Sequence, residues 1–154
     1  MHARLRRLNA DYDLVQRAFA NHPYIRLVNA EGNPPEKYTF AFQIDGLTPT
    51  GEESFTPCPL HQAEIFLPVD YPRRPPFCRM TTPVFHPNID PQKICIGDHW
   101  SAGQSLAQMV VHIGQMICYQ SYNLKSPLNA RAAAWAEQNL GSLPLQKTDL
   151  SVGL

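Results

Sequence analysis

Proline constrains this chain more than any other residue type. The sequence holds 15 prolines in 154 residues, and they cluster between Pro57 and Pro91. Each proline ring fixes φ at about −65° and removes a backbone N–H, so these residues largely set the backbone shape in the middle of the chain. The periodic signals for helices lie on either side of this segment.

The first of these signals is an amphipathic pattern near the N-terminus. Arg7 and Asp11 lie four residues apart, as do Asp13 and Arg17, and this spacing suits ion pairs on a helix surface. Pro23 disfavours helical geometry in the residue before it, so we predict that the helix stops at residues 21–22. The apolar positions that define its buried face are Leu5, Leu8, Tyr12, Val15 and Phe19.

Four segments rich in β-forming residues occupy the middle of the chain. They are residues 24–28, 37–44, 61–67 and 77–81. Residues 32–35 and 46–59 contain the glycines and prolines that are typical of connections. Because sequential strands with short links favour antiparallel pairing, we predict an α+β fold with a four-stranded antiparallel meander.

The second half of the chain returns to helical patterns. Ser105 and Gln108 form a capping box, and apolar residues follow at helical spacing, which predicts the core helix beneath the sheet. Ser126 followed by Pro127 is typical of a second helix start, and that helix should end at Gly141. The length fits one domain, residues 1–141, with a C-terminal tail at residues 142–154.

The composition limits the kinds of partner that the chain can bind and the compartment in which we expect it. Thirteen basic residues balance thirteen acidic ones, so no net field favours nucleic acid or an anionic membrane. The longest apolar runs are too short to span a membrane, and the N-terminus lacks the apolar segment of a signal peptide. The four cysteines are widely spaced, which argues against a metal site or a dithiol centre. We therefore expect free thiols, a cytoplasmic location and no cofactor.

Cys95 differs from the other three cysteines in its surroundings. It lies in a largely non-regular segment between Pro91 and Trp100, where a thiol can meet another protein. Asn88 precedes it, and the amide N–H of such a side chain can support a developing oxyanion, an effect worth about 2.7–4 kcal/mol. Asn88 could equally close the turn through backbone contacts. Cys95 is the candidate nucleophile, and Asn88 is its candidate support.

Acid–base candidates lie close to the same thiol. Asp98 and His99 follow it, although most such neighbours in loops have no catalytic role. His86 is next to Pro87, and we interpret it as packing of the turn. A cysteine hydrolase would need a histidine partner from among His86, His99 and His112, but no protease signature surrounds the cysteine. That function remains an alternative.

Several short motifs resemble those of one family, the ubiquitin-conjugating (E2) enzymes. In chain order they are Tyr71-Pro72, Pro75-Pro76, His86-Pro87-Asn88, Ile94-Cys95-Ile96, Trp100-Ser101 and Pro127-Leu128. The resemblance covers nearly the whole chain and implies the UBC fold. It also implies that Cys95 accepts a ubiquitin-like modifier from an E1 activating enzyme and passes it to an amine, usually a lysine, of a protein substrate.

Other positions depart from the pattern of this family. Ser126 stands where an acidic residue commonly precedes the Pro-Leu pair, so acceptor activation would fall to Asp98, Asn123 or solvent. Arg73 replaces an aromatic residue that often docks E3 ligases, so a requirement for an E3 stays open. The shorter loop after Cys95 and the lack of a long final helix resemble compact bacterial E2-like proteins. Those proteins are encoded in conjugation operons associated with defence against phage.

The resemblance also assigns the N-terminal helix to docking of the E1 enzyme. The arginines concerned are Arg4, Arg6, Arg7 and Arg17, for which a solvated helix face is an equally good interpretation. Lys93, two residues from Cys95, is the expected site of self-modification. The alternative within the same fold is a non-catalytic module that binds a modifier or another partner.

Overall fold

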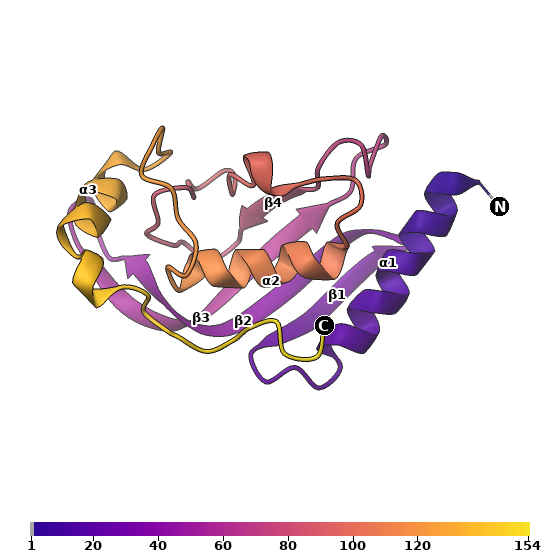
Figure 1. Ribbon diagram of the computed structural model, residues 1–154, viewed down its shortest axis with the longest axis horizontal. Helices are drawn as coiled ribbons and strands as arrows, with labels where there is room; N and C mark the ends of the chain where they lie inside the picture. The colour runs from indigo at the N-terminus through magenta and orange to yellow at the C-terminus, as the bar shows by residue number, and fades with distance from the viewer. Residues whose placement is uncertain (1) are drawn as a thin grey trace.

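The computed structural model describes residues 2–154, with the side chain of Asp98 excepted. Figure 1 shows α2 lying across one face of a sheet, with α1 at one end of the molecule and α3 at the other. In chain order the elements are α1 (Ala3–Phe19), β1 (Ile25–Gly32), β2 (Pro35–Pro49), β3 (Phe55–Phe66), β4 (Phe77–Met80), the 3₁₀ turn η1 (Gly97–His99), α2 (Leu106–Ile117), α3 (Ala130–Gln138) and the 3₁₀ turn η2 (Leu140–Ser142).

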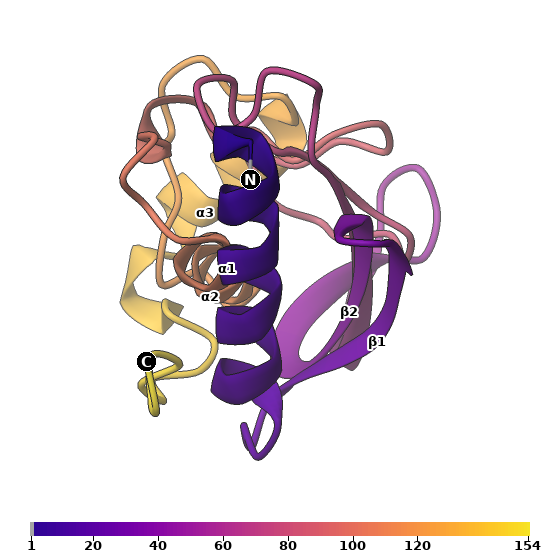
Figure 2. The same ribbon diagram turned by 90° about the vertical axis from the view of Figure 1, so that its right-hand side faces the viewer.

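The predicted antiparallel meander is confirmed. The strands pair in the order β1-β2-β3-β4, and each pair is antiparallel. The alternating apolar residues Tyr38, Phe40, Phe42 and Ile44 of β2 are all buried, because they face α2 and α1 on the covered side of the sheet. Figure 2 shows the same layers end on, with α1 in front and the sheet at one side of α2.

The expected connection at residues 46–59 is wrong, because β2 and β3 continue to pair through most of it. After a register shift between Gln43 and Gly46, pairing resumes at Gly46 opposite Cys58 and runs to Pro49 opposite Phe55. A β-carbon at Gly46 would lie 2.7 Å from Nε2 of His61, so the close approach requires glycine here. Since β4 pairs only with Ala63–Phe66, the earlier part of β3 is an edge, where prolines are tolerated.

The capping box predicted at the start of α2 is present. The Ser105 hydroxyl accepts from the Gln108 N–H at 3.1 Å, and the Gln108 side chain accepts from the Ser105 N–H at 3.0 Å. The helix that follows is buried along most of its length, and Leu106, Met109 and Ile113 are fully enclosed. It is the predicted core helix beneath the sheet.

The last helix begins later than Ser126 and Pro127 suggested. Its N-cap is Asn129, whose side chain accepts from the Ala132 N–H at 3.0 Å. The N–H groups of Leu128 and Asn129 both donate to the carbonyl of Pro87, at 2.8 and 3.1 Å. These contacts hold the backbone out of the helix, and Ser126 itself adopts a left-handed φ of 51°. The prediction of a cap at Ser126 is therefore wrong.

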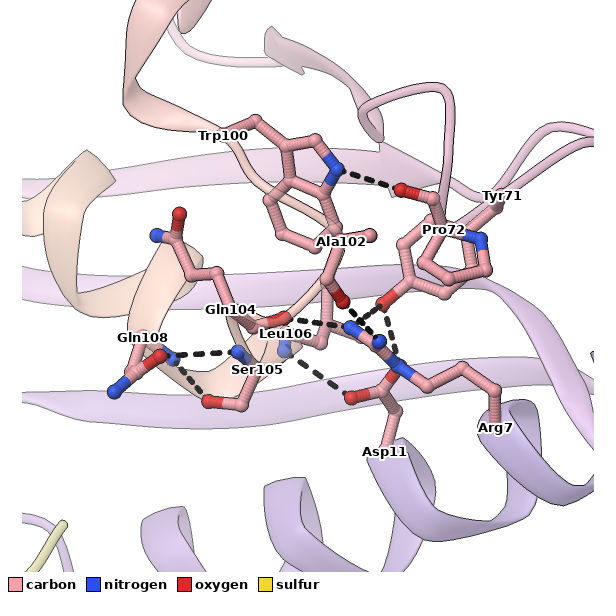
Figure 3. A network of polar contacts seen from close by, with 10 residues as sticks. All are labelled: Arg7, Asp11, Tyr71, Pro72, Trp100, Ala102, Gln104, Ser105, Leu106 and Gln108. Carbon is pink, nitrogen blue, oxygen red and sulfur yellow. Dashed lines mark hydrogen bonds and ion pairs between the residues drawn. The ribbon is translucent and has the colours of Figure 1, made fainter.

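A buried carboxylate joins α1 to the rest of the molecule. Asp11 is only 3% exposed and accepts from Nε of Arg7 at 2.8 Å, so the predicted Arg7–Asp11 ion pair is present. The same carboxylate accepts from the Tyr71 hydroxyl and from the Leu106 N–H at the start of α2 (Figure 3). Asp11 thereby connects α1, the proline-rich segment and the core helix.

Residues 142–154, expected as a tail, lie along α2 and return towards α1 (Figure 1). Leu150 is fully buried in the main core, and its carbonyl is 2.8 Å from Nε2 of His22. The side chain of Gln146 accepts from the Asp45 N–H at 2.8 Å, and the Leu145 N–H donates to the carbonyl of Cys118. We call residues 143–154 the C-terminal strap.

Candidate active site

The thiol of Cys95 is exposed because the backbone around it alternates between buried and open positions. Ile94 and Ile96 are 4% and 5% exposed, whereas Cys95 between them faces outward. The N–H of Ile94 donates to the carbonyl of Cys78 in β4, which ties the segment to the edge of the sheet. The N–H of Cys95 donates to the carbonyl of Asn88 at 2.9 Å, so this thiol sits on a fixed backbone.

The other three cysteines lack this exposure. Cys78 and Cys118 are buried, and burial raises the pKa of the Cys78 thiol to about 12 and that of Cys118 to about 11. Cys58 is half-buried in β3, away from the candidate site, and its thiol donates to the carbonyl of Leu60. Buried thiols of raised pKa are inert towards other proteins. Cys95 is the exposed cysteine, as the sequence predicted for the nucleophile.

A groove of about 200 Å³ opens beside Cys95. Three parts of the chain contribute to it: the segment around Cys95, one face of α2, and the loop that follows α2. The lining residues are Asn88, Cys95, Ile96, Gly97, His99, His112, Met116, Ser121, Tyr122, Asn123, Lys125 and Ser126. The groove therefore joins the predicted residues Cys95, Asn88, His99, Asn123 and Ser126 in one place.

Asn88 fastens the loop after α2 to the segment of Cys95. Its carboxamide oxygen accepts from the Asn123 N–H at 2.8 Å, and its NH₂ donates to the Asn123 carbonyl at 2.9 Å. Its own carbonyl accepts from Cys95, so one residue sets the distance between the two walls of the groove. One hydrogen of the NH₂ is left for a further partner, since Asn123 takes a single N–H.

His86 packs in the turn, as the sequence analysis interpreted it. Its Nδ1 accepts from the Asn88 N–H at 3.0 Å, so Nε2 carries the proton and donates to the Ser121 carbonyl at 3.1 Å. Burial lowers the pKa of His86 to about 4, so the ring is neutral at pH 7. With both nitrogens bonded to backbone groups, His86 holds the turn and the loop after α2 together.

The ring of His99 lies against that of His112, with ring centres 4.3 Å apart and the ring planes tilted by 38°. Burial and the neighbouring His99 lower the pKa of His112 to about 4, and its Nε2 has no hydrogen-bond partner. The sequence indicates His112 only as a possible hydrolase partner, because helical spacing does not show which residues lie over the helix. The candidate Asp98 falls outside the described side chains.

The hydrolase alternative lacks its central contact. Within the described residues, no hydrogen bond joins the Cys95 thiol to an imidazole, although His99 and His112 line the same groove. Among those residues there is also no group of three or more metal-ligating side chains. A cysteine–histidine pair is what nucleophilic hydrolysis at sulfur needs.

Trp100 and Arg7 secure the chain just after the thiol segment. The Trp100 indole N–H donates to the Pro72 carbonyl at 2.8 Å, and its ring lies beside that of Tyr71 (Figure 3). The Arg7 guanidinium donates to the carbonyls of Ala102 and Gln104. Residues 100–105 are therefore fixed between α1 and the proline-rich segment.

The four arginines of α1 divide into two pairs. Arg4 is half-buried, donates to the Pro68 carbonyl at 3.0 Å and pairs with Glu36 at 3.6 Å. Arg7 is committed to the Asp11 network. Arg6 and Arg17 are exposed on the helix surface.

Among the described residues, no helix has the length and hydropathy of a membrane-spanning segment.

Much of this sequence matches known proteins. Residues 36–143, more than two thirds of the chain, match the family described as "Ubiquitin-conjugating enzyme". Ubiquitin-conjugating enzyme E2 3 of Arabidopsis thaliana is 35% identical over 74 residues, which are 46% of this chain and 48% of that protein. Ubiquitin-conjugating enzyme E2-20 kDa of Schizosaccharomyces pombe is 36% identical over 70 residues, or 43% and 39% of the two chains. The matches thus span about half or less of these relatives.

Solved structures share the fold. One of them, the crystal structure of a protein described as a ubiquitin conjugating enzyme from Plasmodium yoelii, superposes with a TM-score of 0.62. The match covers 92% of this chain and 88% of the other, at 20% sequence identity. The UBC-like fold expected from the motifs is confirmed.

Buried His86 makes the stability of the fold depend on pH. The pKa of His86 is about 4 in the folded chain, whereas its ordinary value is 6.5. Between these two pH values the unfolded chain binds a proton at this residue and the folded chain does not. The free energy of unfolding should fall by about 2.5 kcal/mol from pH 8 to pH 4.5 through this residue. Urea denaturation at the two pH values measures it.

The matched variants are His86→Gln, which keeps a donor and an acceptor, and His2→Gln at an exposed position. The first should lose less stability on acidification than the parent, and the second should behave like the parent. An equal loss in all three proteins would show that His86 does not titrate in this range.

Proposed function

The chain belongs to the ubiquitin-conjugating enzyme family, and we propose that it is an active member that carries its modifier on Cys95. In this proposal the Cys95 thiolate attacks the thioester carbonyl of a modifier held by an E1 enzyme, and the E1 thiol leaves. An amine of a protein target, usually a lysine, then attacks the new thioester and releases Cys95. The observation that carries the proposal is the exposed thiol at the mouth of a groove large enough to admit such an amine.

We also propose that it is a compact conjugating enzyme of the bacterial kind that works in the cytoplasm, where thiols stay reduced. Two features of the chain support the compact kind. The segment from Asn88 to Cys95 forms a tight turn, in which Ile89 bridges to Ile94. After the nine residues of α3 the chain continues as the irregular C-terminal strap. In the bacterial systems that these features resemble, the E1 enzyme and the modifier are encoded beside the conjugating enzyme, so those neighbours are the reagents for the test.

Loading of Cys95 is the test of this function. With ATP and the E1 and modifier encoded beside its gene, the wild-type protein should gain an adduct that reductant removes. Cys95→Ser should give an ester that resists reductant, because an oxygen ester replaces the thioester, and Cys95→Ala should give no adduct. Non-reducing and reducing gels separate these outcomes.

Cys58→Ser is the matched control, because Cys58 is the other cysteine that is not buried, and this variant should load like the wild type. An adduct that survives in Cys95→Ala would contradict the proposal. Absence of any adduct would leave a non-catalytic module that binds a modifier or another partner.

We also propose that Asn88 supports the reaction at Cys95 as a donor to the oxyanion. Asn88 is 8% exposed and lines the groove, and its NH₂ has an N–H beyond the one bonded to Asn123. A donor held in place before the reaction costs no reorganisation when charge develops on the carbonyl oxygen. Asn123 and Ser126 line the same groove, where they can contact the incoming amine.

Removal of this donor should slow discharge of the thioester to free lysine by about 10²–10³ in single-turnover measurements. Asn88→Ala tests the whole side chain. Asn88→Asp keeps an acceptor for the Asn123 N–H but offers no donor when ionised, and it should be slowed as well. Discharge of Asn88→Asp at the wild-type rate would show that Asn88 acts only by anchoring the loop.

For docking of the E1 enzyme we propose the exposed arginines of α1. Arg6 and Arg17 are eleven residues apart, about three helical turns, and so lie on one face of the helix. Arg7 cannot be used to test docking, because its loss would break the Asp11 network. An acidic surface on the E1 enzyme would be attracted to this face.

The double variant Arg6→Glu and Arg17→Glu should need about tenfold more E1 for half-maximal loading, because like charges now oppose encounter. The matched control is Arg131→Glu, a charge reversal on α3 at the other end of the molecule. Titration of E1 in the loading assay gives the result. Superimposable curves for the double variant and wild type would remove α1 from the docking surface.

A further inference from the structure

The groove beside Cys95 contains a lysine of this chain. Of its four lysines, all within the described residues, Lys125 is the one that lines this groove. We propose that Lys125 is an acceptor for the acyl group carried on Cys95 of the same chain, so that the protein modifies itself within its own groove. This inference rests on the proposed function for the source of the acyl group.

The two walls that carry the thiol and the lysine are fixed to one residue. The carbonyl of Asn88 holds the N–H of Cys95 at 2.9 Å, and its carboxamide holds both backbone groups of Asn123 at 2.8 and 2.9 Å. Lys125 follows Asn123 by two residues. These hydrogen bonds fix the backbone that carries the thiol relative to the backbone that carries the lysine, which favours reaction within the chain over encounter between chains.

The loop that carries Lys125 is itself held in shape. The Lys125 N–H donates to the side chain of Asn123 at 2.8 Å, and Ser126 next to it adopts a left-handed φ of 51°. At the other end of the loop, the N–H of Ser121 donates to Gln115 in α2, and its carbonyl accepts from His86. A backbone held at both ends presents Lys125 to the groove, while its side chain stays exposed and able to move.

Lys93 is closer to Cys95 in sequence, and it was the expected site of self-modification. In the structure its backbone closes a tight turn: the Lys93 N–H donates to the Asp90 side chain, and its carbonyl accepts from the Asp90 N–H. Lys93 is exposed but is not among the residues that line the groove. The two lysines therefore differ in position relative to the reacting thiol, and this difference makes them a matched pair.

The chemistry balances without a further reactant. The Lys125 ammonium first releases a proton to solvent. Its nitrogen lone pair then attacks the thioester carbonyl, a C–N bond forms, and the C–S bond to Cys95 breaks. The second proton lost by the nitrogen offsets the one taken up by the leaving thiolate. The products are an amide on Lys125 and a free thiol at Cys95.

The product would occupy the space that an external acceptor needs. An acyl chain attached at Lys125 lies in a groove of about 200 Å³, and Asn123 and Ser126 on the same wall would be covered. Self-modification would therefore stop the enzyme after loading when no target amine is present. Transfer to an external amine and transfer to Lys125 compete for one thioester.

A chemical probe tests this inference without an E1 enzyme. A fluorescent, lysine-free peptide that ends in Gly-Gly is supplied as its mercaptoethanesulfonate thioester, which loads Cys95 by thiol exchange. After excess probe is removed, the amide that resists reductant is compared with the thioester formed, and mass spectrometry locates it. Lys125→Arg keeps the charge but cannot be acylated, and it should lower the amide-to-thioester ratio at least about tenfold.

The controls identify the route. Lys93→Arg should leave the ratio unchanged, and Cys95→Ala should form no amide at Lys125, because the acyl group must pass through sulfur. The rate of amide formation should be the same when the loaded protein is diluted tenfold, as a reaction within one chain requires. Amide at Lys93 or elsewhere, an unchanged ratio in Lys125→Arg, or a rate that falls on dilution would overturn the inference. None of these results depends on E1, so failure here is distinct from failure to load from E1.

Discussion

The buried carboxylate of Asp11 is the contact on which the arrangement of the helices depends. A charge at 3% exposure is costly unless it is paired and hydrogen-bonded, and Asp11 meets this condition only if three segments converge. Arg7 comes from its own helix, Tyr71 from the proline-rich segment and the Leu106 N–H from the start of α2. Another packing of α1 would leave this carboxylate with Arg7 alone, without the Tyr71 hydroxyl and the Leu106 N–H, so the network favours one position for this helix.

Asn88 is a second polar residue that joins separate segments: it fixes the parts of the chain that form the groove, as Asp11 fixes the helices. The hydrogen bonds of its carboxamide are neutral and go to backbone groups, so Asn88 fixes distances without placing a charge beside the thiol. Neutral His86 adds a further link between the turn and the loop after α2. The groove is thus held by hydrogen bonds from Asn88 and His86 to backbone groups, and the exposed side chain of Lys125 is not part of them.

Local patterns predicted the helices α1 and α2, the order of the strands and the exposure of Cys95, because each is encoded in periodicity or in neighbouring residues. They failed where a distant segment decides the structure. The Pro87 carbonyl accepts from the N–H groups of Leu128 and Asn129, which keeps a helix from starting at Ser126. Gly46 has no β-carbon to clash with His61, so β2 can continue to pair with β3 there. For the same reason, the contact between the rings of His99 and His112 and the place of Lys125 in the groove could not be predicted from spacing along the chain.

The C-terminal strap has a consequence for the order in which the molecule is completed. Leu150 packs against Gly114 of α2, where a β-carbon on the glycine would lie only 3.2 Å from the leucine side chain. Until residue 150 leaves the ribosome, this part of the core is open to water. Cys95 precedes Leu150 by more than fifty residues, so the reactive thiol is already in the chain before this part of the core can be completed.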